Sequence, residues 1–363
     1  MSAKVVHIAL SHLVGHPLSI VKALNAYTEY SARFVNIFQF KYGIYENDLL
    51  MPDDYEEIVD VINDADIIHL HQVIELENNA LNVDFKKLQK EGKKIIRQWS
   101  SEPGHYRYYG MPDVDHFLDE ENVLHLVTGQ YHERFYGNAI PVPLLLDSGK
   151  FAGHDTSFDM TDPVLAYSPS NQFSIEEKRW ATKGYHEFLK MIKDIQTDSR
   201  FRLDLIEDVP HSEVLKRKAV ATMVADEMCT GTYHTSALEG LALGKPTFSY
   251  LDQRTAMTLA TMTGTNEVPF ICTTMKQFPD VFREILNDHG LCASIGEYSR
   301  KWFNDYYHES KLIRFHADIY DKLLNGEIKT ERLNISYNPG EDFLKKRQFD
   351  LVFNINNLLG IED

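Results

Sequence analysis

The sequence contains little cysteine, with three residues in 363, at positions 229, 272 and 292. Their number is odd, and their spacing matches neither a disulfide framework nor a set of zinc ligands. Scarce, unpaired cysteine is typical of proteins that stay in a reducing compartment. We therefore expect a cytoplasmic protein without disulfides or structural zinc.

Long apolar runs are also missing. No run approaches the ~20 residues that a helix needs to cross a bilayer, so we expect no integral membrane segment. Residues 5–10 form a strand-length apolar run directly after Met-Ser-Ala-Lys, and no small-residue cleavage site follows it. This pattern differs from that of a secretory signal peptide, and we expect none.

Positive charge is in deficit, because 37 Lys and Arg face 54 Asp and Glu, for a formal net charge of -17. Such a chain repels duplex DNA and anionic membranes on average. Basic residues cluster at 86–87, 93–94 and 345–347, although such clusters more often lie on solvated helix faces. We expect no nucleic-acid partner, and peripheral membrane contact stays open as an alternative.

The order of expected elements indicates an α/β protein with parallel sheets. A strand at residues 5–11, a helix at 18–30 and a strand at 32–40 form a βαβ opening. A chain of 363 residues exceeds one ordinary core, so two domains are expected. Residues 147–162 carry Gly, Asp and Ser without periodicity and predict the linker. The expected division is 1–150, 151–328 and a tail at 329–363 that packs on the body.

The most informative stretch runs from residue 229 to residue 250. It follows an apolar run at 219–225 that predicts a buried strand, and it opens with a small-residue turn at 230–234. A short helix follows, which Gly244 and Pro246 end. A turn that leads from a strand into a helix points free backbone N–H groups beyond the strand end, and such groups suit a phosphate.

Within this stretch, Ser236-Ala-Leu-Glu239-Gly-Leu-Ala-Leu-Gly-Lys-Pro246 resembles the donor-site signature of GT-B glycosyltransferases, especially family 4. The resemblance implies two Rossmann-like domains facing a central cleft. In that family two glutamates are separated by seven residues, and the second, matched by Glu239, holds the ribose of a nucleotide-sugar. The position of the first glutamate holds Gly231. A competing interpretation is a capping box, in which Glu239 only ties down its own helix.

The resemblance also implies further donor contacts. Lys183, before Gly184 at the start of a helix, matches a lysine that neutralises the donor diphosphate. Gly15 matches a glycine in the loop after the first strand. With the helix amides, Lys183 makes a metal unnecessary, so we expect neither metal nor cofactor beyond the donor substrate. The expected donor-binding set is Gly15, Lys183, Gly231, Thr232, Tyr233, His234, Thr235, Ser236 and Glu239.

Acceptor contacts are expected in the first domain. His71 ends a strand at 65–70, where the family often places a histidine near the reacting sugar, and Glu102 lies in the next such loop. Both are candidate general bases. His105 and Arg107 of the same loop suit a sugar-containing acceptor. His69 shares a strand face with His71, but no third ligand is visible nearby, so a metal site is not expected.

These features favour a glycosyltransferase that moves a sugar from a nucleotide-diphosphate sugar to a glycan or other hydroxyl acceptor. The resemblance implies a retaining enzyme of glycan biosynthesis. Two alternatives remain open: a non-catalytic GT-B sugar-binding module, which the missing first glutamate favours, and a DNA-modifying glycosyltransferase, which the net charge disfavours. An NAD-dependent enzyme is disfavoured, because the loop after the first strand lacks Gly-x-Gly-x-x-Gly.

Overall fold

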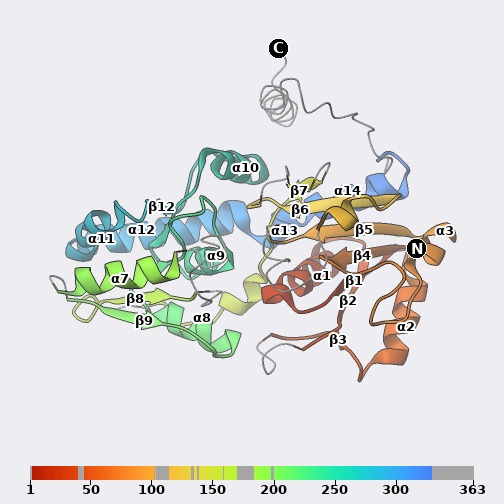
Figure 1. The fold of residues 1–363 in the computed structure, drawn as a ribbon. Helices are drawn as coiled ribbons and strands as arrows, with labels where there is room; N and C mark the ends of the chain where they lie inside the picture. The colour runs from red at the N-terminus through yellow and green to blue at the C-terminus, as the bar shows by residue number, and fades with distance from the viewer. Residues whose placement is uncertain are drawn as a thin grey trace, which may run out of the picture.

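The computed structural model describes residues 2–39, 45–101, 103, 114–131, 135–136, 139–157, 159–169, 184–197 and 200–328. Figure 1 shows two lobes side by side: the first is coloured red to yellow and also carries the blue C-terminal helix, and the second is coloured green to blue. Each lobe is built on one sheet. None of the helices in these described ranges is long and apolar enough to cross a membrane.

Sheet A organises the first lobe. Within the described residues it has seven strands, all parallel. In spatial order they are β3 (Leu49–Leu50), β2 (Ser31–Asn36), β1 (Lys4–Ala9), β4 (Ile67–His71), β5 (Lys94–Trp99), β6 (Val123–Thr128) and β7 (Ile140–Val142). The strand order reverses direction between β1 and β4, which makes this pair the topological switch point of the sheet.

The two faces of sheet A belong to different hydrophobic clusters, because successive side chains of a strand point to opposite faces. Val6 and Ile8 join a cluster with Ile58 of α2 (Tyr55–Asp64) and Phe85 of α3 (Phe85–Lys90). Val5, Ala9 and Ile67 join a second cluster, which extends into the second lobe. Both faces are covered, as a parallel sheet requires.

Sheet B organises the second lobe. The described part has five parallel strands, and its switch point lies between β10 and β8. The spatial order is β12 (Ile271–Cys272), β11 (Thr247–Ser249), β10 (Met223–Ala225), β8 (Val164–Tyr167) and β9 (Arg202–Leu205).

Helices alternate with these strands along the chain. The remaining α-helices are α1 (His16–Tyr27), α5 (Val114–Leu118), α7 (Tyr185–Gln196), α8 (His211–Val220), α9 (Thr235–Ala242), α10 (Gln253–Thr263), α11 (Phe278–Asn287), α12 (His289–Trp302), α13 (Glu309–Leu312) and α14 (Arg314–Leu324). Short helical turns are η1 (Leu13–Gly15), η3 (Ser148–Phe151) and η4 (Phe303–Tyr307).

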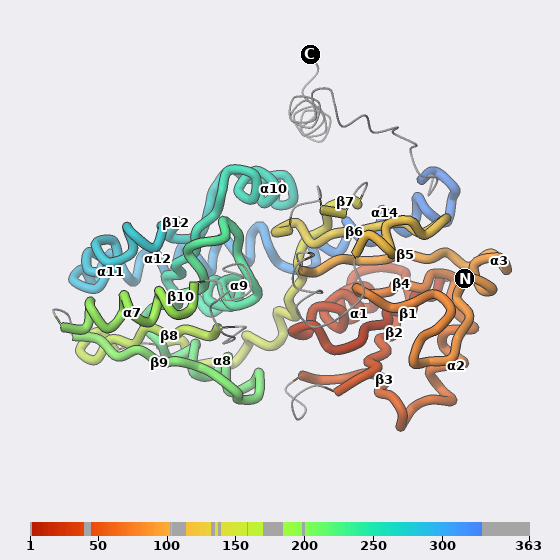
Figure 2. Tube along the Cα trace, in the orientation of Figure 1, coloured from red at the N-terminus to blue at the C-terminus, as the bar shows by residue number. Residues whose placement is uncertain are grey.

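Within the described residues, the chain crosses between the lobes twice, and the two crossings are hydrogen-bonded to each other. The first follows β7, and the second runs through η4 into α13 (Figure 2). The Ser148 hydroxyl donates to Glu309 Oε1 at 2.6 Å, and the Tyr307 hydroxyl donates to the Leu144 carbonyl at 3.0 Å. After the second crossing, α14 packs on the first lobe, where Tyr320 contacts His69 (Figure 1). Residues 309–324 therefore belong by contact to sheet A.

Most expected elements form, with two differences near the informative stretch. The run at 219–225 is a strand only at 223–225, because Ala219 and Val220 complete α8. A short apolar run cannot distinguish the end of a buried helix from a strand. The capping-box interpretation of Glu239 is wrong: His234 is the N-cap of α9, and the Glu239 carboxylate hydrogen-bonds to α8 instead.

Close packing of α12 against the end of α9 generates a stability prediction. A Cβ atom at Gly296 would lie 2.5 Å from the carbonyl oxygen of Gly244, a backbone atom that cannot move alone. We expect Gly296→Ala to reduce the free energy of unfolding by about 1–3 kcal/mol, as overpacking does. Urea unfolding measures this change. The control is Ser294→Ala on the exposed face of α12, expected within about 0.5 kcal/mol of the original chain; equal effects would contradict the packing.

Candidate active site

The candidate site begins at the switch point of sheet B, because ligands of open parallel sheets bind beyond the carboxyl ends of strands at that point. The loop after β10 leads into α9. The start of α7 lies against this loop, since a Cβ atom at Gly184 would be 2.5 Å from Cys229 Sγ. Gly184 has a φ of 72°, in the left-handed region that favours glycine. The two loop ends expected to hold a donor are therefore adjacent.

Two buried acids at the end of β10 organise this loop. Glu227 accepts hydrogen bonds from the backbone N–H of Cys229 at 3.1 Å, Thr230 at 2.8 Å and Thr232 at 3.3 Å. Asp226 Oδ2 accepts from the His234 backbone N–H at 2.9 Å and lies 3.2 Å from His234 Nδ1. Neither acid was expected from the sequence. Both accept hydrogen bonds from backbone amides that were expected to bind a phosphate.

The first turn of α9 keeps unpaired amides. Among the described residues, no acceptor lies within hydrogen-bonding distance of the backbone N–H of Thr235 or Ser236. These groups stand at the positive end of the helix dipole, at the carboxyl edge of sheet B. The expected anion site is thus narrower than residues 232–236, and consists of the amides of these two residues.

Glu239 lies in a buried ionic network below this turn. Its Oε2 atom accepts a hydrogen bond from the Lys218 ammonium at 2.6 Å, and its Oε1 atom lies 2.7 Å from His211 Nε2. Lys218 also donates to the Ser236 hydroxyl at 2.9 Å. Burial alone would raise the pKa of Glu239, but the Lys218 charge and the His211 hydrogen bond outweigh it and lower the pKa to about 2. The carboxylate is therefore ionised near neutral pH.

His211 and Lys218 are functional candidates that the sequence analysis missed. They lie seven positions apart on α8, so helical geometry brings them to one face, toward Glu239. This spacing was a usable signal, but it has meaning only once α8 is known to pack beside α9.

Tyr45 of the first lobe contacts the network of His211 and Glu239. Its ring stacks on His211, with ring centroids 4.6 Å apart and planes at 26°. On its other side, a Cβ atom at Gly15 would lie 3.1 Å from the Tyr45 ring, and Gly15 has a φ of 81°. Burial and the nearby Glu239 charge raise the pKa of Tyr45. The structure thus brings together Gly15 and Glu239, two expected donor contacts from opposite lobes.

Three other expected donor residues make contacts within the protein itself. Gly231 has a φ of 83° and packs against Asp252, whose Cβ would be 3.0 Å from an added Cβ, so a glutamate there would be strained. Tyr233 is buried, stacks on Phe270, and its hydroxyl lies 3.4 Å from that of Tyr307. Thr232 donates through its hydroxyl to the Gln130 carbonyl of the first lobe at 2.9 Å. These contacts shape the interface between the lobes.

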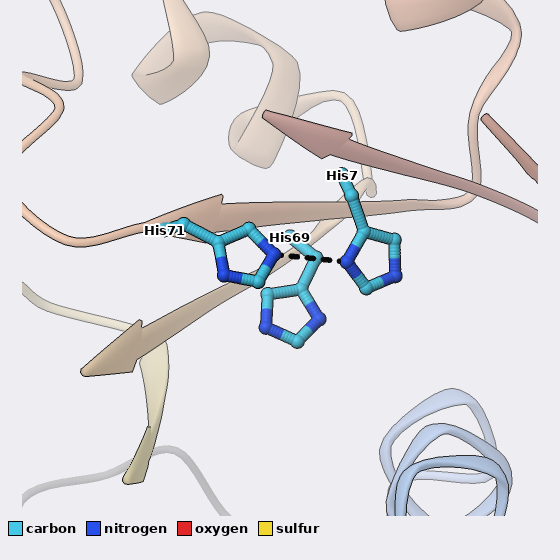
Figure 3. Close-up of side chains that lie close together, drawn as sticks. All are labelled: His7, His69 and His71. Atoms are coloured by element: carbon cyan, nitrogen blue, oxygen red, sulfur yellow. Dashed lines mark hydrogen bonds between the residues drawn. The ribbon is translucent and has the colours of Figure 1, made fainter. Parts of the chain in front are cut away.

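The expected acceptor side is described only in part. Glu102, His105 and Arg107, and also Lys183 of the donor side and the tail at 329–363, lie outside the described residues. His71 is fully buried at the carboxyl end of β4, with Nε2 3.0 Å from His7 Nδ1 (Figure 3). Burial and neighbouring histidines lower the pKa of His71 well below its ordinary value, so the ring is neutral near pH 7.

No family model and no curated protein sequence matches this chain. Solved structures do match it. An alpha-glucosyltransferase in complex with UDP-glucose and DNA containing an abasic site has a TM-score of 0.62 at 11% identity, covering 89% of this chain and 100% of that chain. The sucrose-phosphate synthase of Thermosynechococcus elongatus has a TM-score of 0.53 at 10% identity, with coverages of 89% and 100%. The chain has the GT-B fold.

A third structure shows how far this likeness extends. A proposed UDP-N-acetylglucosamine 2-epimerase from Listeria monocytogenes has a TM-score of 0.50 at 11% identity, covering 92% of this chain and 99% of that chain. Its name describes an epimerase and not a transferase. At such identities the GT-B fold is established and the reaction is not, so the reaction has to be argued from the site.

The ionic network generates a pH prediction. The folded-state pKa of Glu239, about 2, lies below its ordinary value of 4.5, so the ionised form stabilises the fold above about pH 4.5 and this contribution is lost as the pH falls toward 2. At pH 7, Glu239→Gln leaves Lys218 buried and unpaired, and we expect a loss of about 3–5 kcal/mol. The difference between Glu239→Gln and the original chain should shrink on acidification. Urea unfolding at several pH values measures it.

Two variants control this experiment. Glu297→Gln, on the exposed face of α12, should change stability little and without a comparable pH dependence. Combining Lys218→Met with Glu239→Gln removes the stranded ammonium and should recover part of the lost stability. A pH-independent difference between Glu239→Gln and the original chain would contradict the low pKa.

Proposed function

We propose that this protein is a glycosyltransferase, related to family 4, that transfers a sugar from a nucleotide-diphosphate sugar to a hydroxyl acceptor. The observation that carries the proposal is the buried Glu239 carboxylate, paired with Lys218, one turn below the amides of Thr235 and Ser236, which have no acceptor within the part of the chain that the structure describes. This pair stands at the switch point of sheet B in a GT-B fold. The donor would bind the second lobe, and the acceptor the first.

The diphosphate is the leaving group of such a donor, so the site must stabilise negative charge on its oxygens. The Thr235 and Ser236 amides offer two N–H donors at the positive end of α9. Lys183, which directly precedes Gly184, would add a full positive charge beside them. Because these groups can neutralise a diphosphate, we propose that the transfer step needs no metal at the donor.

The ribose would lie at Glu239. A carboxylate accepts about four hydrogen bonds, and Lys218 and His211 account for one on each oxygen. Lone pairs therefore remain for vicinal hydroxyl groups. The stacked rings of Tyr45 and His211 lie directly beside this position. An aromatic pair next to a ribose is suited to pack against a nucleobase.

The acceptor would bind to the loop that follows β5 in the first lobe. We propose a glycan or other hydroxyl acceptor, held by Glu102, His105 and Arg107 in the loop after β5, and retention of configuration at the transferred carbon. DNA is a second candidate acceptor, because two of the similar structures are alpha-glucosyltransferases in complex with DNA. The net charge of -17 opposes it for this chain, so DNA enters as an arm of the test.

The test has two stages with the purified full chain. First, thermal unfolding with UDP-, GDP- and ADP-sugars identifies the donor, since a ligand that binds the folded state raises the midpoint. Second, the radiolabelled donor is offered to oligosaccharides, to free monosaccharides and to hydroxymethylated DNA. We expect label on a saccharide acceptor. Lys183→Ala should reduce it about 100-fold or more, because charge stabilisation at the reacting diphosphate is lost. Glu239→Ala should also reduce it, because the ribose contact is lost.

Matched variants separate loss of function from loss of folding. Lys190→Ala, on an exposed face of α7, and Glu297→Ala should keep full transfer. Donor binding without transfer to any acceptor indicates a sugar-binding module, and a changed sugar on the nucleotide indicates an epimerase. Either result overturns the proposed transferase. Label on DNA alone overturns the proposed saccharide acceptor.

A further inference from the structure

Three histidines converge on one face of sheet A, in the first lobe. His7 on β1 stands in register with His69 on β4, and His71 follows two positions along the same strand face. Figure 3 shows the three rings gathered from the two neighbouring strands. One ring nitrogen from each residue lies within 4.8 Å of the other two, and all three residues are buried.

Tyr320 of α14 fixes the outer sides of two of these rings. Its hydroxyl oxygen lies 2.7 Å from His69 Nδ1 and 3.2 Å from His7 Nε2. An oxygen with two lone pairs can accept an N–H from both rings. That arrangement leaves His7 Nδ1 and His69 Nε2 unprotonated. His7 Nδ1 then accepts the hydrogen bond from His71 Nε2 at 3.0 Å, and the lone pair of His69 Nε2 is free for a ligand. Orientation of metal-binding histidines by an outer hydrogen bond is a general feature of metal sites.

Two buried nitrogens of these three rings have no hydrogen-bond partner within the described ranges. They are His69 Nε2 and His71 Nδ1, both on rings with no exposed surface. A buried polar atom without a partner is costly, and a native fold normally satisfies it. An ion bound by His7, His69 and His71 would use the free Nε2 of His69 and one nitrogen of each other ring. Without an ion, His69 Nε2 stays unsatisfied.

We propose that His7, His69 and His71 form a binding site for a divalent transition-metal ion, with Zn²⁺ the best match. Three nitrogen ligands suit Zn²⁺ and its neighbours in the first row, whereas Mg²⁺ and Ca²⁺ prefer oxygen. His7 Nδ1 and His71 Nε2, at 3.0 Å, are already spaced as two ligands of one ion. Tetrahedral zinc places its nitrogens about 3.3 Å apart. The three ring nitrogens here lie within 4.8 Å of one another, so metal binding would draw the rings closer together.

The ion would tie β1 to β4 at the switch point of sheet A, beneath α14. This role is separate from the donor diphosphate, which the proposed function assigns to sheet B. It also removes His71 from the candidate general bases, because a metal-bound nitrogen cannot accept the acceptor's proton. Glu102 then remains as the candidate.

The test uses the full chain without an affinity tag, freed of metal by a chelator and titrated with Co²⁺ and Zn²⁺. Tetrahedral Co²⁺ absorbs strongly in the visible range, and Zn²⁺ should displace it at about one ion per chain. Zn²⁺ at 100 times its dissociation constant should also shift the folding equilibrium about 100-fold, which raises the unfolding midpoint. Anomalous X-ray scattering at the zinc edge locates the ion in crystals of the original chain.

Graded variants assign the ligands. His69→Gln and His71→Gln should abolish the visible Co²⁺ band, whereas Tyr320→Phe, which removes only the outer hydrogen bonds, should weaken binding about 10–100-fold. The matched control is His316→Gln: this buried histidine of α14 lies outside the three-residue cluster and should leave the band intact.

The proposal is overturned if the original chain shows no Co²⁺ band at saturating metal, or if His316→Gln weakens binding as much as His69→Gln. Should a ligand variant fail to fold, the anomalous map of the original chain decides. Density among His7, His69 and His71 supports the site, and an ion elsewhere, or none in zinc-soaked crystals, rejects it. Sugar transfer is not a readout here, so failure of the metal site and failure of the proposed function remain distinguishable.

Discussion

The buried ion pair between Lys218 and Glu239 is the contact on which the arrangement of the second lobe depends. Neither charge is tolerable there alone, so α8 and α9 must pack with their ammonium and carboxylate in contact. This packing sets where the amides of Thr235 and Ser236 point, and it positions His211 for the first-lobe ring of Tyr45. One electrostatic requirement thus couples helix packing, anion binding and contact between the lobes.

The fold and part of the candidate site could be predicted from local sequence. Alternating apolar runs and helix-length segments indicated two parallel sheets, and the stretch that contains Glu239 indicated where a donor would bind. Both depend on residues close together in the chain, where periodicity and turn chemistry act. The replacement of a glutamate by Gly231 was visible, but its reason, a left-handed backbone packed on Asp252, required coordinates.

The rest depends on pairing between distant segments. His69 and His71 were recognised on one strand face, and the third ring, His7, was missed because only the register of β1 with β4 brings it beside them. Asp226 and Glu227 looked like ordinary polar residues after a strand, although together they accept hydrogen bonds from four of the loop amides. Tyr45 had no local signal at all. Strand register and contacts between lobes are not encoded in any short window.

The paired crossings near Ser148 and Glu309 restrict how the two lobes can move. Two connections at separate places would prevent rotation of one lobe relative to the other. A single connection would allow rotation in any direction. Two connections bound side by side act as a pivot, which permits rotation about one axis and resists sliding. Rotation about this pivot would separate Tyr45 from His211, whereas α14 would move with the first lobe, to which Tyr320 joins it.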